Sequence, residues 1–258
     1  MPNYYGRKPD HHDTRDRILR FPQHLVQAIP PSANVLTGLN LPVFDQGSEG
    51  SCTANSGVLY RRWLYQRFSK TPQADHDLSR QFLYYQERAL PWNNSVNEDS
   101  GAAMRDICVV LANVGVCPEI DYPYTANFTN APTPQAIVDA ADRKVGAYHR
   151  LPDLETVKCC LATGPAAYPV LIGFPVFQSF ESIGSDGMMP MPEKNESQIG
   201  GHAVVCHGFD DGRAALSIQN SWGADWGAAG HFYMPYAFFN KYITQIDCWM
   251  MHLGKIWK

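Results

Sequence analysis

Gln46-Gly-Ser-Glu-Gly-Ser-Cys52-Thr-Ala-Asn55 places a cysteine six residues after a glutamine, with small residues between them and a predicted helix behind. A thiol at the start of a helix lies near unpaired backbone N–H groups and the positive end of the helix dipole, and both favour the thiolate. The N–H of Cys52 and the side-chain amide of Gln46 can together hydrogen-bond an oxyanion. The stretch alone leaves two interpretations, a nucleophilic cysteine or a buried structural cysteine in a turn, and the second is the more common finding.

Two later segments favour the first interpretation. Gly200-Gly-His202-Ala-Val-Val-Cys-His-Gly-Phe-Asp210 is an apolar run opened by two glycines, which predicts a buried strand with a histidine at its entrance. In Ile218-Gln-Asn220-Ser-Trp222-Gly-Ala-Asp-Trp226-Gly227, an asparagine ends another short strand before a loop that contains two tryptophans. A histidine within reach of the thiol can accept its proton and later return it to a leaving amine. An asparagine oxygen can hold the ring in one tautomer, and indole rings over that bond would exclude water.

These segments resemble the papain family of cysteine peptidases, whose Cys-His-Asn arrangement they repeat in the same order over most of the chain. By this resemblance, Gln46 is the oxyanion-hole residue, Cys52 the nucleophile, His202 the general base and acid, and Asn220 the residue that orients the histidine. The resemblance implies a cysteine endopeptidase that hydrolyses peptide bonds through an acyl-enzyme thioester. It also implies a peptide or protein substrate and no cofactor, metal ions included.

Three positions depart from the family pattern. The family has a cysteine three residues before the nucleophile and usually an aromatic residue after it, whereas this chain has Glu49 and Thr53, so the usual local disulfide cannot form. Gly201 precedes the histidine, where the family often has Asp or Asn. An unpaired carboxylate at Glu49 would raise the pKa of the thiol, and the alternative is that Glu49 is solvated or caps the helix. These changes affect rate and pH optimum more than the type of reaction.

Two other functions use the same residues. One is a Cys-dependent acyl transferase or peptide ligase, which passes the acyl group to an amine instead of water. The other is a catalytically silent homologue that only binds peptides. The intact Gln-Cys-His-Asn set argues against the silent homologue, because a binding protein needs no oxyanion donor. The Asn220-Ser-Trp-Gly223 context favours a peptidase over the transferase.

The resemblance also implies an α+β fold of the papain type, in which a helical domain and an antiparallel β-barrel-like domain enclose the active-site cleft. We expect an N-terminal extension over residues 1–38 and a catalytic domain over residues 39–258. Its helical half covers about 45–150 and its β-rich half about 151–250.

Hydrophobic spacing and turn residues support this division. Helices are expected in four segments, at 52–64, 79–90, 100–113 and 153–163. Strands are expected in five segments, at 168–174, 202–209, 214–219, 230–235 and 245–253.

Six residues border the substrate by the resemblance, namely Gly101, Ala102, Gly173, Gly200, Ala203 and Trp222. The loop that ends in Ser100-Gly101-Ala102 resembles the family's glycine pair along the cleft, where an extended peptide can pair with the backbone, although an ordinary helix cap explains it equally well. Trp222 corresponds to the indole that shields the histidine. The small residues Gly173 and Ala203 lie near the pocket for the second residue before the scissile bond. They predict a bulky apolar or aromatic side chain in that pocket.

The N-terminal forty residues differ from the remainder of the chain. Asp10-His-His-Asp-Thr-Arg-Asp-Arg17 is polar, and Pro30-Pro31 interrupts regular structure. The segment lacks the spaced pattern of the family's long helical pro-segments and is similar to the brief extension of some bacterial members. Our hypothesis is that residues 1–35 lie across or beside the cleft and slow substrate entry as an intramolecular inhibitory segment, and the alternative is a wrapped or frayed terminus. The adjacent histidines are interpreted as solvated instead of metal-binding.

Composition is consistent with such an enzyme. The chain has 258 residues, 45% of them hydrophobic, and a formal net charge of −4 without a block of basic residues, so nucleic acid is not an expected partner. No apolar run approaches the roughly 18 residues of a membrane span, and no signal peptide is recognised, so we expect a cytoplasmic protein if the sequence is complete. Seven cysteines, with Cys159 and Cys160 adjacent, fit neither a disulfide framework nor a zinc motif. A reducing compartment is therefore expected.

Overall fold

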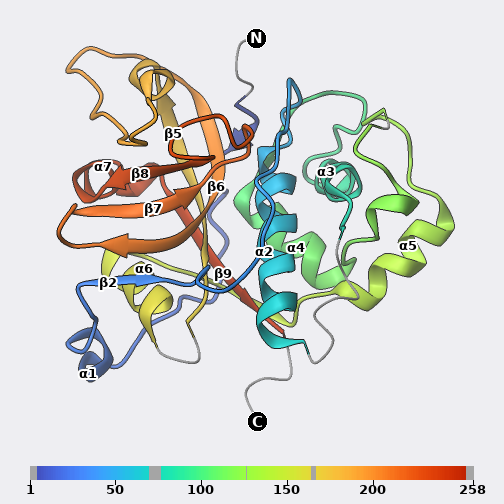
Figure 1. Cartoon of the computed structure of the whole chain (residues 1–258). Helices are drawn as coiled ribbons and strands as arrows, with labels where there is room; N and C mark the ends of the chain where they lie inside the picture. Colours follow the sequence, from blue (N-terminus) through green and yellow to red (C-terminus); the bar gives the residue numbers. More distant parts are fainter. Residues whose placement is uncertain (1–4, 70–76, 126, 164–166, 254–258) are drawn as a thin grey trace.

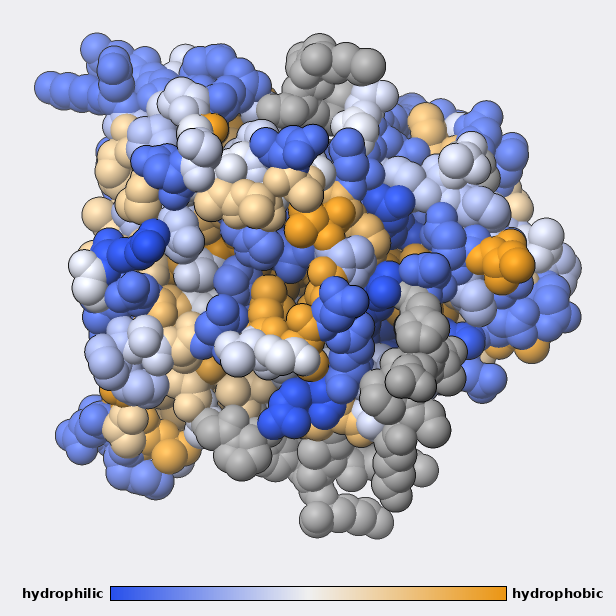
Figure 2. Space-filling view, in the orientation of Figure 1, coloured by the Kyte–Doolittle hydropathy of each residue, from blue (hydrophilic) through white to orange (hydrophobic). Residues whose placement is uncertain are grey.

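The structure is a computed structural model that describes residues 5–69, 77–125, 127–163 and 167–253. In this part of the chain, a group of helices and a seven-stranded antiparallel sheet lie side by side (Figure 1). The helical half contains α2 (Cys52–Phe68), α3 (Arg80–Ala89), α4 (Met104–Asn113) and α5 (Pro134–Ala140). This division confirms the expected α+β fold. On the face shown in Figure 2, apolar side chains gather near the middle and hydrophilic side chains surround them.

The sheet follows the order β4–β9–β5–β6–β7–β8, and β2 pairs with β6 outside this path. Its strands are β2 (Ser32–Asn34), β4 (Ala147–Arg150), β5 (Val170–Phe177), β6 (Gln198–Asp210), β7 (Ala215–Gln219), β8 (His231–Pro235) and β9 (Asp247–His252). The five strands expected from the sequence are all present. Two strands of this seven-stranded sheet were not expected. They are β4, which lies just before the predicted β-rich half, and β2, which lies inside the predicted N-terminal extension. The extension therefore contributes an edge strand to the sheet.

The central helix α2 is buried along most of its length because it packs against β6 on one side and against α3 and α4 on the other. Gly57 allows the close approach of these helices, since a Cβ there would lie 2.6 Å from the Ile107 side chain and 2.7 Å from that of Leu83. At the far end of the helix, Trp63 donates its indole N–H to the carbonyl of Val35, 2.9 Å away. These contacts fix the start of α2, and with it Cys52, against the sheet.

Helix starts follow from capping side chains. Ser79 accepts a hydrogen bond from the N–H of Phe82 at the start of α3, and Asp153 accepts one from Thr156 at the start of α6 (Leu154–Ala162). The helix expected over 100–113 begins later, at Met104, because β3 (Ala102–Ala103) pairs with β1 (Arg7–Lys8) instead. Gly115, with φ of +91°, follows the end of α4 as expected.

Shorter elements complete the described structure. They are α1 (Gln23–Val26), α7 (Tyr236–Lys241) and the 3-10 turns Glu119–Asp121, Ala141–Arg143, Gln178–Ser182 and Ile243–Gln245. All seven cysteines are free and buried. No described helix has both the length and the apolar character that crossing a membrane requires.

Candidate active site

Cys52 is the first residue of α2, and its side chain is fully buried. The helix dipole and the backbone hydrogen bonds from Ala203, Gly6 and Thr53 favour the thiolate. Burial has the opposite and larger effect, and it raises the pKa of the thiol to about 11. The thiol is therefore protonated at neutral pH in this state of the protein.

His202 lies on β6 and immediately precedes Ala203. The backbone of Ala203 contacts the Cys52 thiol. Nε2 of His202 is 2.7 Å from Oδ1 of Asn220, so Nε2 donates the hydrogen bond and carries the proton of the neutral ring. Nδ1 is buried and has no hydrogen-bond partner in the described structure. Burial lowers the pKa of His202 to about 4, against the opposing effect of Asn220. The ring is neutral with its lone pair on Nδ1, the form that can accept a proton from a thiol.

Replacing Asn220 by alanine is expected to lower kcat on the order of 10-fold with little change in KM, because the ring loses the acceptor that fixes its tautomer while no charge is removed. Steady-state hydrolysis of a small peptide amide measures this effect. Ser217→Ala, on the same β7–loop segment but without a contact to the histidine, is the matched control. An equal loss in both variants would contradict the orienting role.

Aromatic rings enclose the histidine. Trp222 stacks on His202 with ring centroids 4.9 Å apart and planes inclined by 29°, while Phe174 and Phe180 approach the imidazole at 6.0 and 6.3 Å. Trp226 meets Trp222 edge-on at 5.0 Å. These rings keep water from the His202–Asn220 hydrogen bond, as the sequence predicted for the indoles.

Gln46 is 2% exposed and held at both ends of its amide. Nε2 donates to the carbonyl of Glu49, and Oε1 accepts from the hydroxyl of Ser221, next to Asn220. The amide is thus fixed between the loop before Cys52 and the loop after Asn220. Neither alternative for Glu49 is correct: its carboxylate is mostly buried, accepts a hydrogen bond from Gln81 and caps no helix. Burial raises the pKa of Glu49.

The N-terminal segment runs between the helical half and the sheet, a course that the sequence indicated only in general terms. Residues 5–16, here called the strap, enter the cleft between the two halves. The strap runs parallel to β3, with Arg7 opposite Ala102, and the N–H of Ala102 donates to the carbonyl of Gly6 at 3.0 Å. On the opposite wall, Gly6 forms a parallel bridge with Gly201. A backbone group of Gly6 also hydrogen-bonds the Cys52 thiol.

Close packing leaves no room for larger residues along this path. A Cβ on Gly6 would overlap the carbonyl of Gly50, and one on Gly101 would overlap the carbonyl of Gly6. A Cβ on Gly200 would lie 2.5 Å from the side chain of Tyr5. The strap therefore occupies the space beside Gly101 and Gly200.

The other residues expected to border the substrate also lie along the strap. Ala102 pairs with it, as described above. Gly173 pairs in register with Ala203 and faces the side chain of Arg7. The Trp222 ring lies 5.9 Å from that of Tyr5. All six residues that the resemblance named thus line one continuous path, now filled by the strap.

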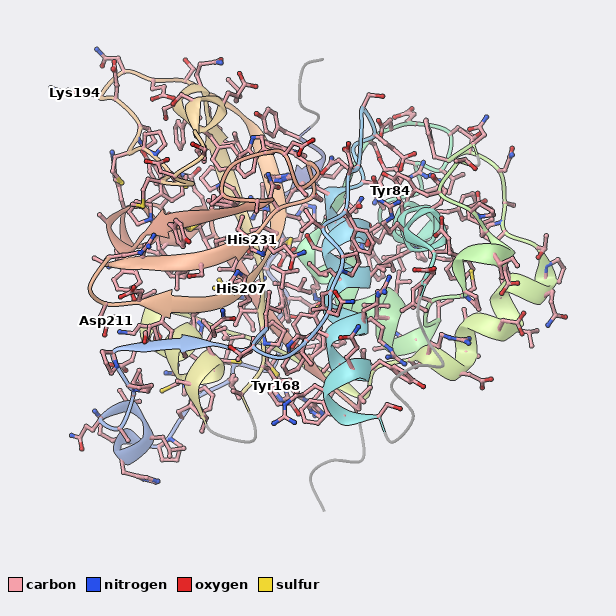
Figure 3. The ribbon with its side chains drawn as sticks, in the orientation of Figure 1. Tyr84, Tyr168, Lys194, His207, Asp211 and His231 are labelled. Atoms are coloured by element: carbon pink, nitrogen blue, oxygen red, sulfur yellow. The ribbon has the colours of Figure 1, made fainter. Side chains whose placement is uncertain are left out.

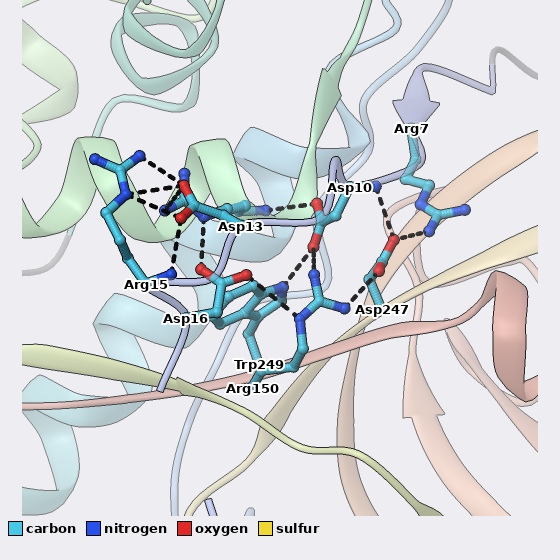
Figure 4. A network of polar contacts seen from close by, with 9 residues as sticks. Arg7, Asp10, Asp13, Arg15, Asp16, Arg150, Asp247 and Trp249 are labelled. Atoms are coloured by element: carbon cyan, nitrogen blue, oxygen red, sulfur yellow. Dashed lines mark hydrogen bonds and ion pairs between the residues drawn. The ribbon is translucent and has the colours of Figure 1, made fainter. Parts of the chain in front are cut away.

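Ion pairs fasten the strap to the body of the protein (Figure 4). Asp10 accepts from Arg150, from the indole of Trp249 and from the backbone N–H of Arg105 at 2.7–2.9 Å. Asp16 pairs with Arg105 at 2.7 Å. Burial and the neighbouring Asp247 raise the pKa of Asp10 to about 6. At neutral pH, the docked position of the strap therefore depends on the Asp10 carboxylate and the several donors that hold it.

The remaining histidines and cysteines lie outside this constellation. His207, on β6, hydrogen-bonds Asn34 and meets the ring of His231 edge-on at 5.1 Å, and both histidines lie on the sheet side of the molecule (Figure 3). Burial lowers its pKa to about 3. His11 and His12 are exposed. No group of three metal-ligating side chains occurs among the described residues.

Known proteins resemble most of this chain. Residues 34–247 match the model of the papain family of cysteine proteases. A peptidase C1-like protein of Acanthamoeba polyphaga mimivirus is 31% identical, over 96% of this chain and 85% of that protein. The crystal structure of xylellain, a cysteine protease from Xylella fastidiosa, superimposes with a TM-score of 0.84 at 34% identity, over 96% of both chains. The probable cysteine protease RD21C of Arabidopsis thaliana is 26% identical over 74% of this chain, which spans only 40% of that relative.

Proposed function

This chain belongs to the papain family of cysteine peptidases, and we propose that it cleaves peptide bonds with Cys52 as nucleophile and His202 as general base and acid. The observation that carries this assignment is the orientation of the histidine. Its Nε2 is engaged by Asn220, and its buried Nδ1 has no partner in the described structure. The adjoining Ala203 touches the thiol. Contact of the thiol with the backbone next to His202 supports this imidazole as the acceptor of the thiol proton.

The proposed reaction proceeds in two halves. His202 takes the thiol proton as sulfur attacks the carbonyl carbon, and it then protonates the leaving amine to leave a thioester on Cys52. Water, deprotonated by the same imidazole, hydrolyses the thioester. The N–H of Cys52 and the amide of Gln46 stabilise the oxyanion in both halves. Sequence kinship with cysteine peptidases supports hydrolysis over acyl transfer to an amine or mere peptide binding.

A peptide-bearing epoxide tests the catalytic pair, because it alkylates a thiolate and the modified residue can be mapped by mass spectrometry. Labelling takes place in the open state, after the strap has lifted, where the thiol and the imidazole can form an ion pair. There, His202→Ala is expected to slow labelling of Cys52 roughly 30-fold at pH 7, since an ordinary thiol of pKa about 8.5 is only about 3% ionised. The strap covers the site equally in both chains, so the ratio of rates isolates the histidine. His207→Ala, a buried histidine on the same strand, is the matched control. Labelling spread over several cysteines would contradict the assignment.

The chain direction of the strap is opposite to that of a substrate that could be cleaved. Because His202 protonates the leaving amine, the leaving-group side of the cleft is next to its ring, where Tyr5 lies with centroids 6.2 Å apart. A substrate must therefore place its acyl side at the position of Arg7 and run from there towards Tyr5. The strap runs the opposite way, from Tyr5 to Arg7. Its peptide bond at Gly6 is thus reversed relative to a productive one.

Residues 5–16 accordingly act as an intramolecular inhibitory segment that covers Cys52. Two properties of the docked strap support this role. The strap pairs with backbone on both walls of the cleft, where a substrate would pair. It also buries the thiol and imidazole, and burial favours the unreactive neutral thiol.

A further inference from the structure

The side chain of Arg7 fills a pocket in the wall of the cleft. Only 2% of this side chain is exposed. Its guanidinium forms an ion pair with Oδ2 of Asp247 (Figure 4) and donates to the backbone carbonyl of Gln245 at 3.2 Å. Along its length it passes Gly173, where a Cβ would lie 2.7 Å from Nε of Arg7 and 2.5 Å from the side chain of Met104.

The pocket is built by the body of the protein and not by the strap. Asp247 begins β9 and is the register partner of Gly173 on β5, so two hydrogen-bonded strands fix their separation. Met104 begins α4 and is fully buried. The carboxylate is held from behind, because its Oδ1 accepts from Nη1 of Arg150 at 2.9 Å. Oδ2 is left to face the strap, where it also accepts from the N–H of Asp10.

The position of this pocket relative to the scissile bond rests on the proposed function. Gly6 lies against Cys52, and Tyr5 lies on the leaving-group side, beside His202. Arg7 therefore extends one residue beyond Gly6 on the acyl side. A substrate that runs in the productive direction would place the side chain of its second residue before the scissile bond in this pocket.

We propose that the pocket selects a basic side chain, arginine before lysine, at the second residue before the scissile bond, and that Asp247 is the residue that determines this specificity. Once the strap leaves, Oδ2 of Asp247 and the Gln245 carbonyl are two acceptors at the base of an enclosed site. An apolar side chain would desolvate both without replacing their hydrogen bonds, which is costly. In the strap, Nη2 of the guanidinium reaches both acceptors while Nε lies beside Gly173, so the planar group also fills the pocket. An ammonium is a compact, strongly hydrated point charge.

Three neighbouring residues also affect what the pocket can bind. Arg150 is the other cation that contacts Asp247, but it occupies Oδ1 and leaves Oδ2 for the ligand. The small residues Gly173 and Ala203 were the basis for predicting a bulky apolar side chain from the sequence. These two small residues set the width of the pocket, and the Asp247 carboxylate selects the charge of the substrate side chain that occupies it.

The test uses the full chain and a series of blocked dipeptide amides that share one reporter leaving group and a final arginine. The preceding residue is arginine, its neutral analogue citrulline, lysine, leucine or phenylalanine. For the unaltered protein, kcat/KM is expected to be roughly 10-fold to 150-fold higher with arginine than with citrulline, the range for a lost hydrogen bond to a charged group. This comparison needs no variant, so it does not depend on the folding of a mutant.

Asp247→Asn is expected to reduce the arginine-to-leucine ratio of kcat/KM by the same factor. Because this change also loosens the strap, absolute rates change for every substrate, and only the ratio reports on the pocket. Asp13→Asn is the matched control, since it breaks a strap ion pair with Arg105 and pairs in the described structure with neither Arg150 nor Asp247. Its ratio should equal that of the unaltered protein.

The outcomes separate the two proposals. Hydrolysis of leucine and phenylalanine substrates as fast as that of the arginine substrate would overturn the specificity inference and leave the peptidase intact. A strong arginine preference that survives Asp247→Asn would overturn the role of Asp247. Absence of hydrolysis of every member of the series, together with absence of epoxide labelling at Cys52, would instead count against the proposed function.

Discussion

Replacing Cys52 by alanine should abolish peptide hydrolysis, with a loss in kcat of at least about 10⁴-fold. No other nucleophile is expected to take over, because an alanine at this position leaves the imidazole with water alone. The measurement is release of a fluorescent amine from a blocked dipeptide amide at high enzyme concentration, which keeps a residual rate detectable. Unchanged thermal unfolding would show that the loss is chemical and not structural.

Cys159→Ala is the matched control for this experiment. Cys159 is equally buried but lies on α6, which packs on the sheet and does not border the strap. This variant should retain the activity of the parent chain. Retention of more than about 1% of activity by Cys52→Ala would mean that the nucleophile lies elsewhere.

The second large effect is expected from Gly6→Leu, which should raise hydrolysis of a small peptide amide on the order of 100-fold. A side chain at this position would collide with the Gly50 carbonyl while Gly101 confines the strap from the other side. Backbone lies on both sides, so the strap must lift and expose Cys52. The gain in rate cannot exceed the free energy with which the strap docks. A 100-fold gain corresponds to about 2.7 kcal/mol, which is less than the sum of two hydrogen bonds to charged groups.

Alkylation of Cys52 by iodoacetamide provides a second measurement of strap release. Burial raises the pKa of this thiol in the covered state, so the labelling rate of the parent chain should rise only at alkaline pH. In Gly6→Leu the profile should shift towards lower pH, because removal of the strap restores solvent to the thiolate. Pro9→Ala, an exposed strap residue, should behave like the parent. Equal rates in all three chains would show that the strap does not control access to Cys52.

The catalytic residues and the strands around them could be predicted because they lie in local sequence patterns. The catalytic residues stand in short motifs with fixed spacing, and the structure brings His202 and Asn220 together as the motifs predicted. The strands around them were recognised because each is a short apolar run between turn residues. Fold class and candidate catalytic residues could therefore be predicted before any coordinates.

The course of the strap could be predicted only as a hypothesis, because it depends on contacts between residues far apart in the chain. Asp10 is held by Arg150 and by Trp249, respectively 140 and 239 residues later. Nothing in the polar run around Asp10 identifies these partners. Asp247 was missed for a related reason, although a signal existed: it is a charged residue at the entrance of the otherwise apolar strand Asp247–His252.

The edge strand β2 has a consequence for how long the cleft stays open. Ser32–Asn34 remains hydrogen-bonded to β6 when the strap lifts, and residues 17–19 pair with Arg150 of β4. Residues 17–31 therefore form a short, partly anchored leash that keeps the released segment near the cleft. Such a leash gives an effective concentration on the order of millimolar, which dilution of the enzyme does not change. A diffusing peptide must outcompete that local concentration, whereas a single cut within the leash would free the cleft and leave the sheet whole.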